Sequence, residues 1–132
     1  MPIKNCPCGR NKTYSDCCKK AHENILSVKT PEDLMRSRYS AFVLSNVDYL
    51  IKSWSPNTCD SSLQAKKEIK QWSKSVNWLK LEILNSSLLS EKDLTGTVEF
   101  KAFYIENGKT QCIHENSLFE KTNRHWVYVN KV

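Results

Sequence analysis

The last third of the chain alternates hydrophobic and polar residues. A period of two residues recurs in four stretches: WLKLEILNS, GTVEFKAFYI, KTQCIHENSLFEK and RHWVYVN. This period is typical of strands that bury one face. Asn107-Gly108 separates the second stretch from the third, and this dipeptide favours a tight hairpin turn. The pattern predicts four antiparallel strands, over residues 78–86, 96–105, 109–121 and 124–130.

The segment before these strands carries helical signals. In VKTPEDLMRSRYSAF, Thr30 can cap a helix, Pro31 suits the first helical position, and two acidic residues follow in the first turn. This helix is expected to extend to about Ser45, with a second over 47–54 and a third within 61–78. Helices followed by strands favour an α+β fold, with three helices packed on a curved antiparallel sheet of about four strands.

Length and composition limit the class of protein. The chain has 132 residues, the size of one domain with a small appendage, and 39% of them are hydrophobic, which is enough for a core. No apolar run approaches the ~20 residues that cross a membrane. The polar N-terminus lacks the apolar segment of a secretion signal. We therefore expect a cytoplasmic protein with reduced thiols and no membrane contact.

A cysteine-rich segment, NCPCGRNKTYSDCCKKAH, lies near the N-terminus. Two close cysteine pairs separated by a loop suit a tetrahedral thiolate site for one structural Zn²⁺ per chain. A segment this short and polar could hardly stay folded without a metal. A disulfide pair and an iron–sulfur or redox role are the alternatives. The expected ligands are Cys6, Cys8, Cys17 and Cys18, with His22 as the alternative fourth ligand.

The stretch CPCGRNKTYSDCC resembles the SEC-C motif, a small zinc-binding module. In that motif, two cysteines one residue apart are followed after eight residues by Cys-Cys or Cys-His, and every ligand position is matched here. Arg10-Asn11 stands where the motif often has Ser, a departure that leaves the ligands intact. The resemblance implies a metal whose four positions are all filled by protein. It places a zinc-binding segment at residues 1–26 and a second domain at residues 27–132.

Blocks along the rest of the chain resemble the bacterial YchJ family. They are LMRSRYSAF, SWSPNT, VEFKAFY, HENSLFEK and WVYV. The family couples a SEC-C motif to a cone-shaped, cystatin-like (nuclear transport factor two-like) domain and is generally described as uncharacterised. The resemblance therefore implies the architecture more than the function. Sheets of this fold often pair their exposed face with a second copy, which allows a homodimer.

Positive charge is concentrated near the N-terminus. The formal net charge is +6, and residues 1–29 carry six basic residues against two acidic ones. Four thiolates around a divalent cation would offset part of this excess. A basic surface of this kind predicts an acidic protein partner, with RNA or ribosome binding as an alternative. The expected partner surface consists of Lys4, Arg10, Lys12, Lys19 and Lys20.

A second candidate site lies between the first helix and the third strand. Arg38 falls near the middle of the apolar helix face, where a guanidinium must be paired. Glu115 alternates with hydrophobic residues on its strand and is the expected partner. Together with Tyr39 and Ser117, these residues are expected to line the cavity of the cone. The cluster is interpreted either as an ion pair that fixes helix against sheet, or as a pocket for a small anionic or polar ligand, or as a carboxylate base oriented by an arginine.

The sequence alone favours a noncatalytic interaction module, an adaptor with a structural zinc site. The alternatives are a small-molecule-binding protein or enzyme that uses the cavity near Arg38 and Glu115, and RNA or ribosome binding through the basic zinc segment. No catalytic residue is assigned. The tryptophans and most tyrosines are expected to pack in the core rather than to stack on RNA bases.

Overall fold

The four predicted strands form one sheet in the computed structural model, which describes residues 5–87, 93–122 and 124–132. The strands pair in sequence order, each antiparallel to the next. They are β1 (Asn77–Ser86), β2 (Thr95–Glu106), β3 (Lys109–Thr122) and β4 (His125–Lys131). The α+β class and the antiparallel sheet predicted from the sequence are confirmed.

The hairpin between β2 and β3 has the turn that its sequence favours. Glu106 pairs with Lys109 across a loop of two residues. Asn107 has φ 53° and Gly108 has φ 75°, so both central residues adopt the left-handed conformation of a tight hairpin turn. Nothing would lie within 4 Å of a Cβ added at Gly108. The other predicted turn, Thr122-Asn123, includes a position outside the described residues.

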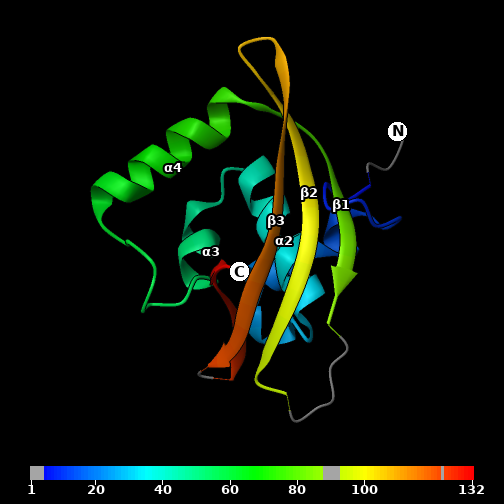
Figure 1. Ribbon diagram of the computed structural model, residues 1–132, viewed down its shortest axis with the longest axis vertical. Helices are drawn as coiled ribbons and strands as arrows, with labels where there is room; N and C mark the ends of the chain where they lie inside the picture. The colour runs from blue at the N-terminus through cyan, green and yellow to red at the C-terminus, as the bar shows by residue number, and fades with distance from the viewer. Residues whose placement is uncertain (1–4, 88–92, 123) are drawn as a thin grey trace.

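The three predicted helices are also present. They are α2 (Pro31–Val43), α3 (Val47–Lys52) and α4 (Leu63–Ser75). Thr30, Asn46 and Ser62 cap them, each accepting a hydrogen bond from a backbone N–H in the first turn. Figure 1 shows α2 behind the strands, where it contacts β1, β2 and β4, with α3 beside α2 and α4 to one side. No helix in the described ranges is long and apolar enough to span a membrane.

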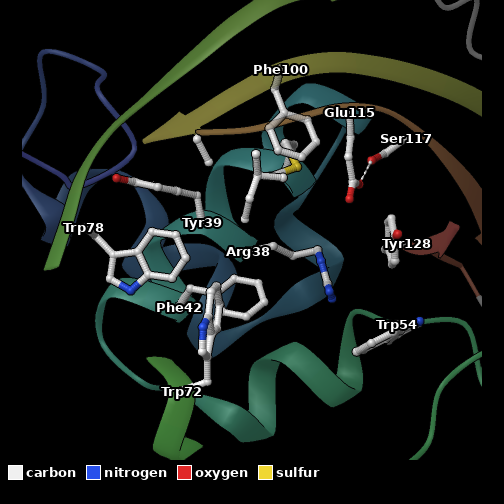
Figure 2. Close-up of a pocket in the computed structure, with 13 residues that line it drawn as sticks. Arg38, Tyr39, Phe42, Trp54, Trp72, Trp78, Phe100, Glu115, Ser117 and Tyr128 are labelled. Carbon is white, nitrogen blue, oxygen red and sulfur yellow. Dashed lines mark hydrogen bonds between the residues drawn. The ribbon is translucent and has the colours of Figure 1, made fainter. Parts of the chain in front are cut away.

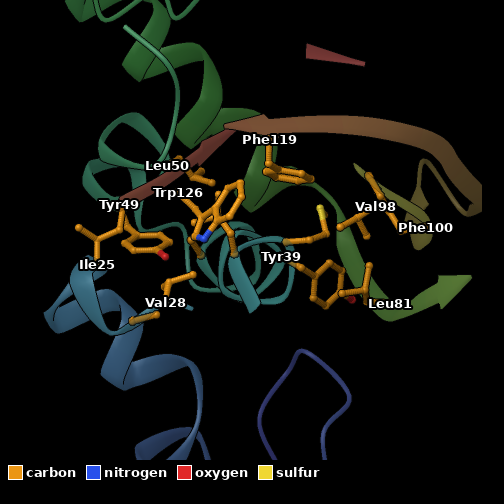
Figure 3. Close-up of a cluster of buried hydrophobic side chains, with 14 of the residues drawn as sticks. Ile25, Val28, Tyr39, Tyr49, Leu50, Leu81, Val98, Phe100, Phe119 and Trp126 are labelled. Atoms are coloured by element: carbon orange, nitrogen blue, oxygen red, sulfur yellow. The ribbon is translucent and has the colours of Figure 1, made fainter. Parts of the chain in front are cut away.

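The hydrophobic core lies between α2 and the covered face of the sheet (Figure 3). Leu34 and Ala41 of α2 are fully buried, as are Val98 of β2 and Phe119 of β3. Ile25 and Val28, which follow the cysteine-rich segment, belong to the same core. The segment after the cysteines is therefore packed on the body and does not hang from it as a free appendage.

Short helical turns that the sequence did not predict form the rest of the N-terminal segment. They are the 3₁₀ turn η1 (Tyr14–Asp16), α1 (Cys18–Glu23) and the 3₁₀ turn η2 (Ile25–Ser27). Thr13 caps η1 and Asn24 caps η2. Such short helices have little stability of their own, so their geometry depends on the cysteines and on contacts with α2.

Candidate functional site

The four cysteines of the N-terminal segment converge on one point. Their Sγ atoms all lie within 4.8 Å of one another, and those of Cys8 and Cys17 are 3.6 Å apart. In a tetrahedral thiolate site with Zn–S bonds of about 2.3 Å, sulfurs are about 3.8 Å apart. The donor set and its spacing therefore fit a metal ion held by Cys6, Cys8, Cys17 and Cys18.

Backbone hydrogen bonds and turns orient these sulfurs toward one point. Cys6 donates its backbone N–H to the carbonyl of Lys12 (2.7 Å), which closes the loop, and the N–H of Gly9 reaches the carbonyl of Cys6 (3.2 Å). Gly9 has φ 95°, a conformation that side chains with a Cβ rarely adopt. Cys17 and Cys18 come from the junction between η1 and α1, so the second ligand pair starts a helix.

The thiols influence one another strongly. Hydrogen bonds from neighbouring thiols, above all from Cys18, lower the pKa of Cys8 to about 5 although burial opposes this. Burial raises the pKa of Cys17 to about 11, and the pKa of Cys18 is raised mainly by its hydrogen bond to Cys8. Because metal-bound cysteines are deprotonated, binding of a divalent cation to this cluster would release protons.

His22, the alternative fourth ligand, is engaged elsewhere. Its Nε2 lies 2.8 Å from the carbonyl oxygen of Ser37, and its Nδ1 lies 2.6 Å from the hydroxyl of Tyr14. Because a carbonyl only accepts, Nε2 carries the hydrogen and Nδ1 accepts from the tyrosine. The structure thus brings the four cysteines together and uses His22 to attach α1 to α2.

The cysteine loop is docked on the N-terminal half of α2 by charged side chains. Arg36 donates from Nη1 to the carbonyl of Cys8 (2.8 Å) and from Nε to Glu32 (3.0 Å). Arg10 pairs with Asp33 (2.5 Å) and with Glu32 (3.4 Å). Arg10, one of the residues of the expected partner surface, thus forms ion pairs with two carboxylates of α2.

The other described residues of the expected partner surface do not share these ion pairs. Lys12, Lys19 and Lys20 are exposed on the cysteine-rich segment. Lys4 lies outside the described residues.

The second candidate site is a cavity of about 200 Å³ between α2, α4 and the covered face of the sheet. All four residues predicted for it, Arg38, Tyr39, Glu115 and Ser117, line it. Figure 2 shows two different ends. One is apolar and rich in aromatic rings, and the other gathers the polar groups around Arg38.

Arg38 is almost fully buried, with 5% of its surface exposed. Its Nη1 donates to the carbonyl of Leu50 (2.9 Å) and to the hydroxyl of Ser53 (2.7 Å). The rings of Trp54 and Tyr128 lie 5.4 and 5.0 Å from the guanidinium carbon. Burial lowers the pKa of Arg38 to about 10, so the group stays charged at neutral pH.

The predicted ion pair between Arg38 and Glu115 is wrong. Within residues 5–87, 93–122 and 124–132, Arg38 forms no ion pair with an acidic side chain. Carbonyl and hydroxyl oxygens at the end of α3 and two aromatic faces meet the guanidinium instead. The prediction failed because the position of α3 beside α2 is a tertiary feature that the helix pattern does not contain.

Glu115 faces the cavity from β3, where it pairs in register with Phe100. Its Oε2 accepts a hydrogen bond from Ser117 Oγ (3.2 Å). In Figure 2 the carboxylate points toward the space that also receives the Arg38 guanidinium. The cavity therefore presents one positive and one negative group that do not neutralise each other directly.

The aromatic end of the cavity consists largely of side chains for which the sequence predicts a place in the core. Trp72 and Trp78 are in edge contact with ring centres 5.4 Å apart, and Tyr39 packs edge-on against Trp78 at 5.7 Å. Trp126 is buried as expected, whereas Trp54, Trp72, Trp78 and Tyr128 line the cavity. An apolar pattern on a helix or strand marks an inward direction and cannot distinguish a filled core from a cavity wall.

The comparisons with known proteins agree with this architecture. A family model described as "YchJ, middle NTF2-like domain" matches residues 30–131. A UPF0225 protein of Vibrio parahaemolyticus is 45% identical over 126 residues, which cover 96% of this chain and 73% of that protein. A UPF0225 protein of Bordetella pertussis is 41% identical over 127 residues, covering 95% of this chain and 90% of the relative.

Two solved structures are similar along nearly the whole chain. A SEC-C motif-containing protein of Rhodopseudomonas palustris has a TM-score of 0.84 at 34% identity, and the match covers 98% of both chains. A SEC-C motif-containing protein of Psychrobacter arcticus has a TM-score of 0.76 at 32% identity, covering 97% of this chain and 81% of that one. With its cysteine cluster docked on an α+β body, the chain belongs to the YchJ (UPF0225) family of SEC-C motif proteins.

Proposed function

We propose that this protein binds a small organic anion in the cavity beside Arg38. The observation that carries the proposal is the buried guanidinium, which is 5% exposed and forms no ion pair in the described part of the chain. A buried charge without a counterion is costly, and an anionic ligand would remove that cost. Among the described residues, the hydrogen bonds of Arg38 all leave from Nη1, so Nε and Nη2 remain as donors for a ligand.

The surroundings of Arg38 support ligand binding over a filled core. Aromatic and aliphatic side chains enclose most of the cavity, and a few polar groups converge at one end. This combination is typical of small-molecule sites. The volume of about 200 Å³ is below the ~300–1,000 Å³ of sites for drug-sized ligands, which fits a small metabolite.

Ligand binding is testable by intrinsic fluorescence, because Trp54, Trp72 and Trp78 line the cavity. We expect small carboxylic acids to change the tryptophan emission and to raise the melting temperature of the wild-type protein. The Arg38→Met variant should lose both responses. Lys52→Met is the matched control, since Lys52 is exposed on α3 and does not line the cavity. Equal responses in the wild type and Arg38→Met, or none from any organic anion, would refute the proposal.

For the cysteine cluster we propose a structural Zn²⁺ ion. Four thiolates favour zinc among the divalent metals common in cells, and a site filled by four protein ligands leaves no position for substrate. Native mass spectrometry of protein purified without added metal should show one zinc per chain. The Cys8→Ser variant should hold less zinc, and Cys112→Ser, at an exposed position outside the cluster, should match the wild type. Paired thiols without metal would exclude the zinc assignment.

A second candidate function, docking of the cysteine-rich segment on an acidic protein, is favoured by the exposure of Lys12, Lys19 and Lys20. With Arg10 engaged by Asp33, the basic surface is smaller than the sequence predicts. Partner proteins captured with the wild type should be lost after metal chelation and in a variant with the three lysines changed to Glu. Identical partner lists under all three conditions would rule out this surface as the binding element.

A further inference from the structure

The polar end of the cavity carries two opposite charges, and each favours a ligand group of the opposite sign. Arg38 presents donors from α2, while Glu115 presents a carboxylate from β3. Ser117 donates to Glu115, but no cationic side chain in the described ranges forms an ion pair with this carboxylate. An anion placed at Arg38 would lie near a negative group, and a cation placed at Glu115 would lie near a positive one.

We propose that the ligand is a zwitterion of the α-amino acid type with an apolar side chain. Its carboxylate would accept from Arg38, and its ammonium group would donate to Glu115. This inference rests on the proposed function and narrows its ligand class. A ligand with both charges pairs with both Arg38 and Glu115. A simple acid pairs with Arg38 only, leaves Glu115 unpaired and adds like-charge repulsion between the two carboxylates.

The lining and volume of the cavity indicate the size and polarity of the rest of the ligand. The end opposite the charges is lined by Tyr39, Phe42, Trp72 and Trp78, whose rings contact one another. Trp54 and Tyr128 flank the guanidinium on the polar side, with ring centres 5.7 Å apart. A long-chain fatty acid or polyisoprenoid would not fit a volume of about 200 Å³, which favours a single branched or aromatic side chain as the apolar part.

The test compares matched molecules that differ by one charge. Calorimetric titrations would use phenylalanine, 3-phenylpropionate and 2-phenylethylamine, and the corresponding series built on leucine. In the wild type, we expect the amino acid of at least one series to bind about tenfold or more tighter than its acid and its amine, because each partner lost leaves a charged group unpaired.

A single substitution should reverse part of this preference. Glu115→Gln keeps an oxygen that accepts from Ser117 and removes the charge, so the fold is retained. In this variant, the acid should gain affinity and bind at least as tightly as the amino acid. Glu99→Gln is the matched control, because Glu99 pairs with His114 on the opposite face of the sheet. It should keep the preference of the wild type.

The outcomes separate this inference from the proposed function. If an acid binds the wild type as tightly as its amino acid, or if only organic anions outside both series bind, the zwitterion is excluded and anion binding stands. If Glu115→Gln keeps the wild-type preference, Glu115 is not the group that selects the ammonium, and the inference is overturned. If no organic anion binds in a manner that depends on Arg38, both proposals are wrong.

Discussion

At the scale of single residues, Gly9 controls the geometry of the cysteine loop. It lies between Cys8 and Arg10 with φ 95°, and an added Cβ would meet the carbonyl oxygen of Leu81 at 3.7 Å and Arg36 Nη1 at 3.8 Å. The space is therefore sufficient for a methyl group, and the backbone conformation is the constraint. Strain introduced here acts on the loop that holds the metal ligands.

We predict that Gly9→Ala weakens metal binding by about tenfold, since the left-handed conformation costs a residue with a Cβ about 1–2 kcal/mol. Competition with a chromogenic chelator measures the affinity. Gly108→Ala is the matched control: it has φ 75° and introduces the same kind of strain in a hairpin far from the cysteines in sequence. It should lower the free energy of unfolding and leave metal affinity unchanged. Equal metal affinities in both variants would contradict the prediction.

His22 gives a prediction on pH. Burial lowers its pKa below the ordinary value, although its bond to the Ser37 carbonyl opposes this. The unfolded chain, with a histidine pKa of about 6.5, therefore binds more protons than the folded one between the two pKa values. The contribution of His22 to stability should be complete above pH 6.5 and fall as the pH decreases through this window.

The ¹⁵N chemical shifts of the His22 ring measure this pKa directly, without interference from the thiols. We expect a neutral ring at pH 6.5 with the hydrogen on Nε2. In His22→Gln, the loss of unfolding free energy between pH 7 and pH 5.5 should be smaller than in the wild type. A ring that titrates above 6.5 would contradict the assignment.

At the scale of elements, α2 connects the two candidate sites. Ser37 and Ser40 face the cysteine-rich segment, where the Ser37 carbonyl meets His22 and the Ser40 hydroxyl lies 3.5 Å from Cys6 Sγ. Arg38 and Tyr39 of the same helix line the cavity. Both faces of α2 are thus occupied, which explains why most of this helix is buried. By contrast, α4 buries only Ser73.

The weak attachment of α4 leads to a prediction on hydrogen exchange. Trp72 Nε1 donates to Glu106 (3.1 Å) and Ser73 bonds to Ser45 (2.9 Å), which anchors the C-terminal half of α4. Amides of α4 should exchange faster than those of α2. Trp72→Phe removes the donor and should accelerate exchange across α4 alone.

The control for this prediction is Gln64→Ala, which removes an exposed bond within α4, from Gln64 to Glu68. It should leave the exchange rates of the C-terminal half of α4 unchanged. Equal effects of Trp72→Phe and Gln64→Ala would show that the Trp72–Glu106 bond does not anchor the helix.

At the scale of the whole molecule, the cysteine cluster and the hydrophobic core are separate units of packing. Cys6, Cys8 and Cys18 form their own buried cluster, whereas the core joins α2 and the sheet with residues from α1 and η2. The two units meet at α2 through Arg36, Arg10 and His22. Loss of the metal should therefore affect the first unit directly and the second only through α2.

We predict that chelation lowers the melting temperature and removes exchange protection from residues 5–23, while the central strands β2 and β3 stay protected. The reason is that Val98 and Phe119 are buried independently of the cysteines. Thermal unfolding and hydrogen exchange with and without a strong chelator measure this, and added Zn²⁺ should restore the original values. Cys8→Ser should show little response to the chelator. A wild type that is equally insensitive would exclude a structural metal.

The sequence by itself determined the four strands, the helices α2 to α4 and the cysteine cluster. Alternation with period two located the four strands, Thr30-Pro31 marked the start of α2, and the spacing of the cysteines predicted the cluster at Cys6, Cys8, Cys17 and Cys18. These features are local: strand faces, helix caps and ligand pairs depend on residues close in sequence.

Only the tertiary structure decided what meets each inward-facing polar group. The pattern showed that Arg38 and Glu115 point inward, but not that the end of α3 takes the guanidinium, nor that Arg10 is neutralised by Asp33. It also could not show that several tryptophans line a cavity instead of filling it. Such contacts join residues from separate elements, and their partners are fixed by how helices pack on the sheet, which no local period records.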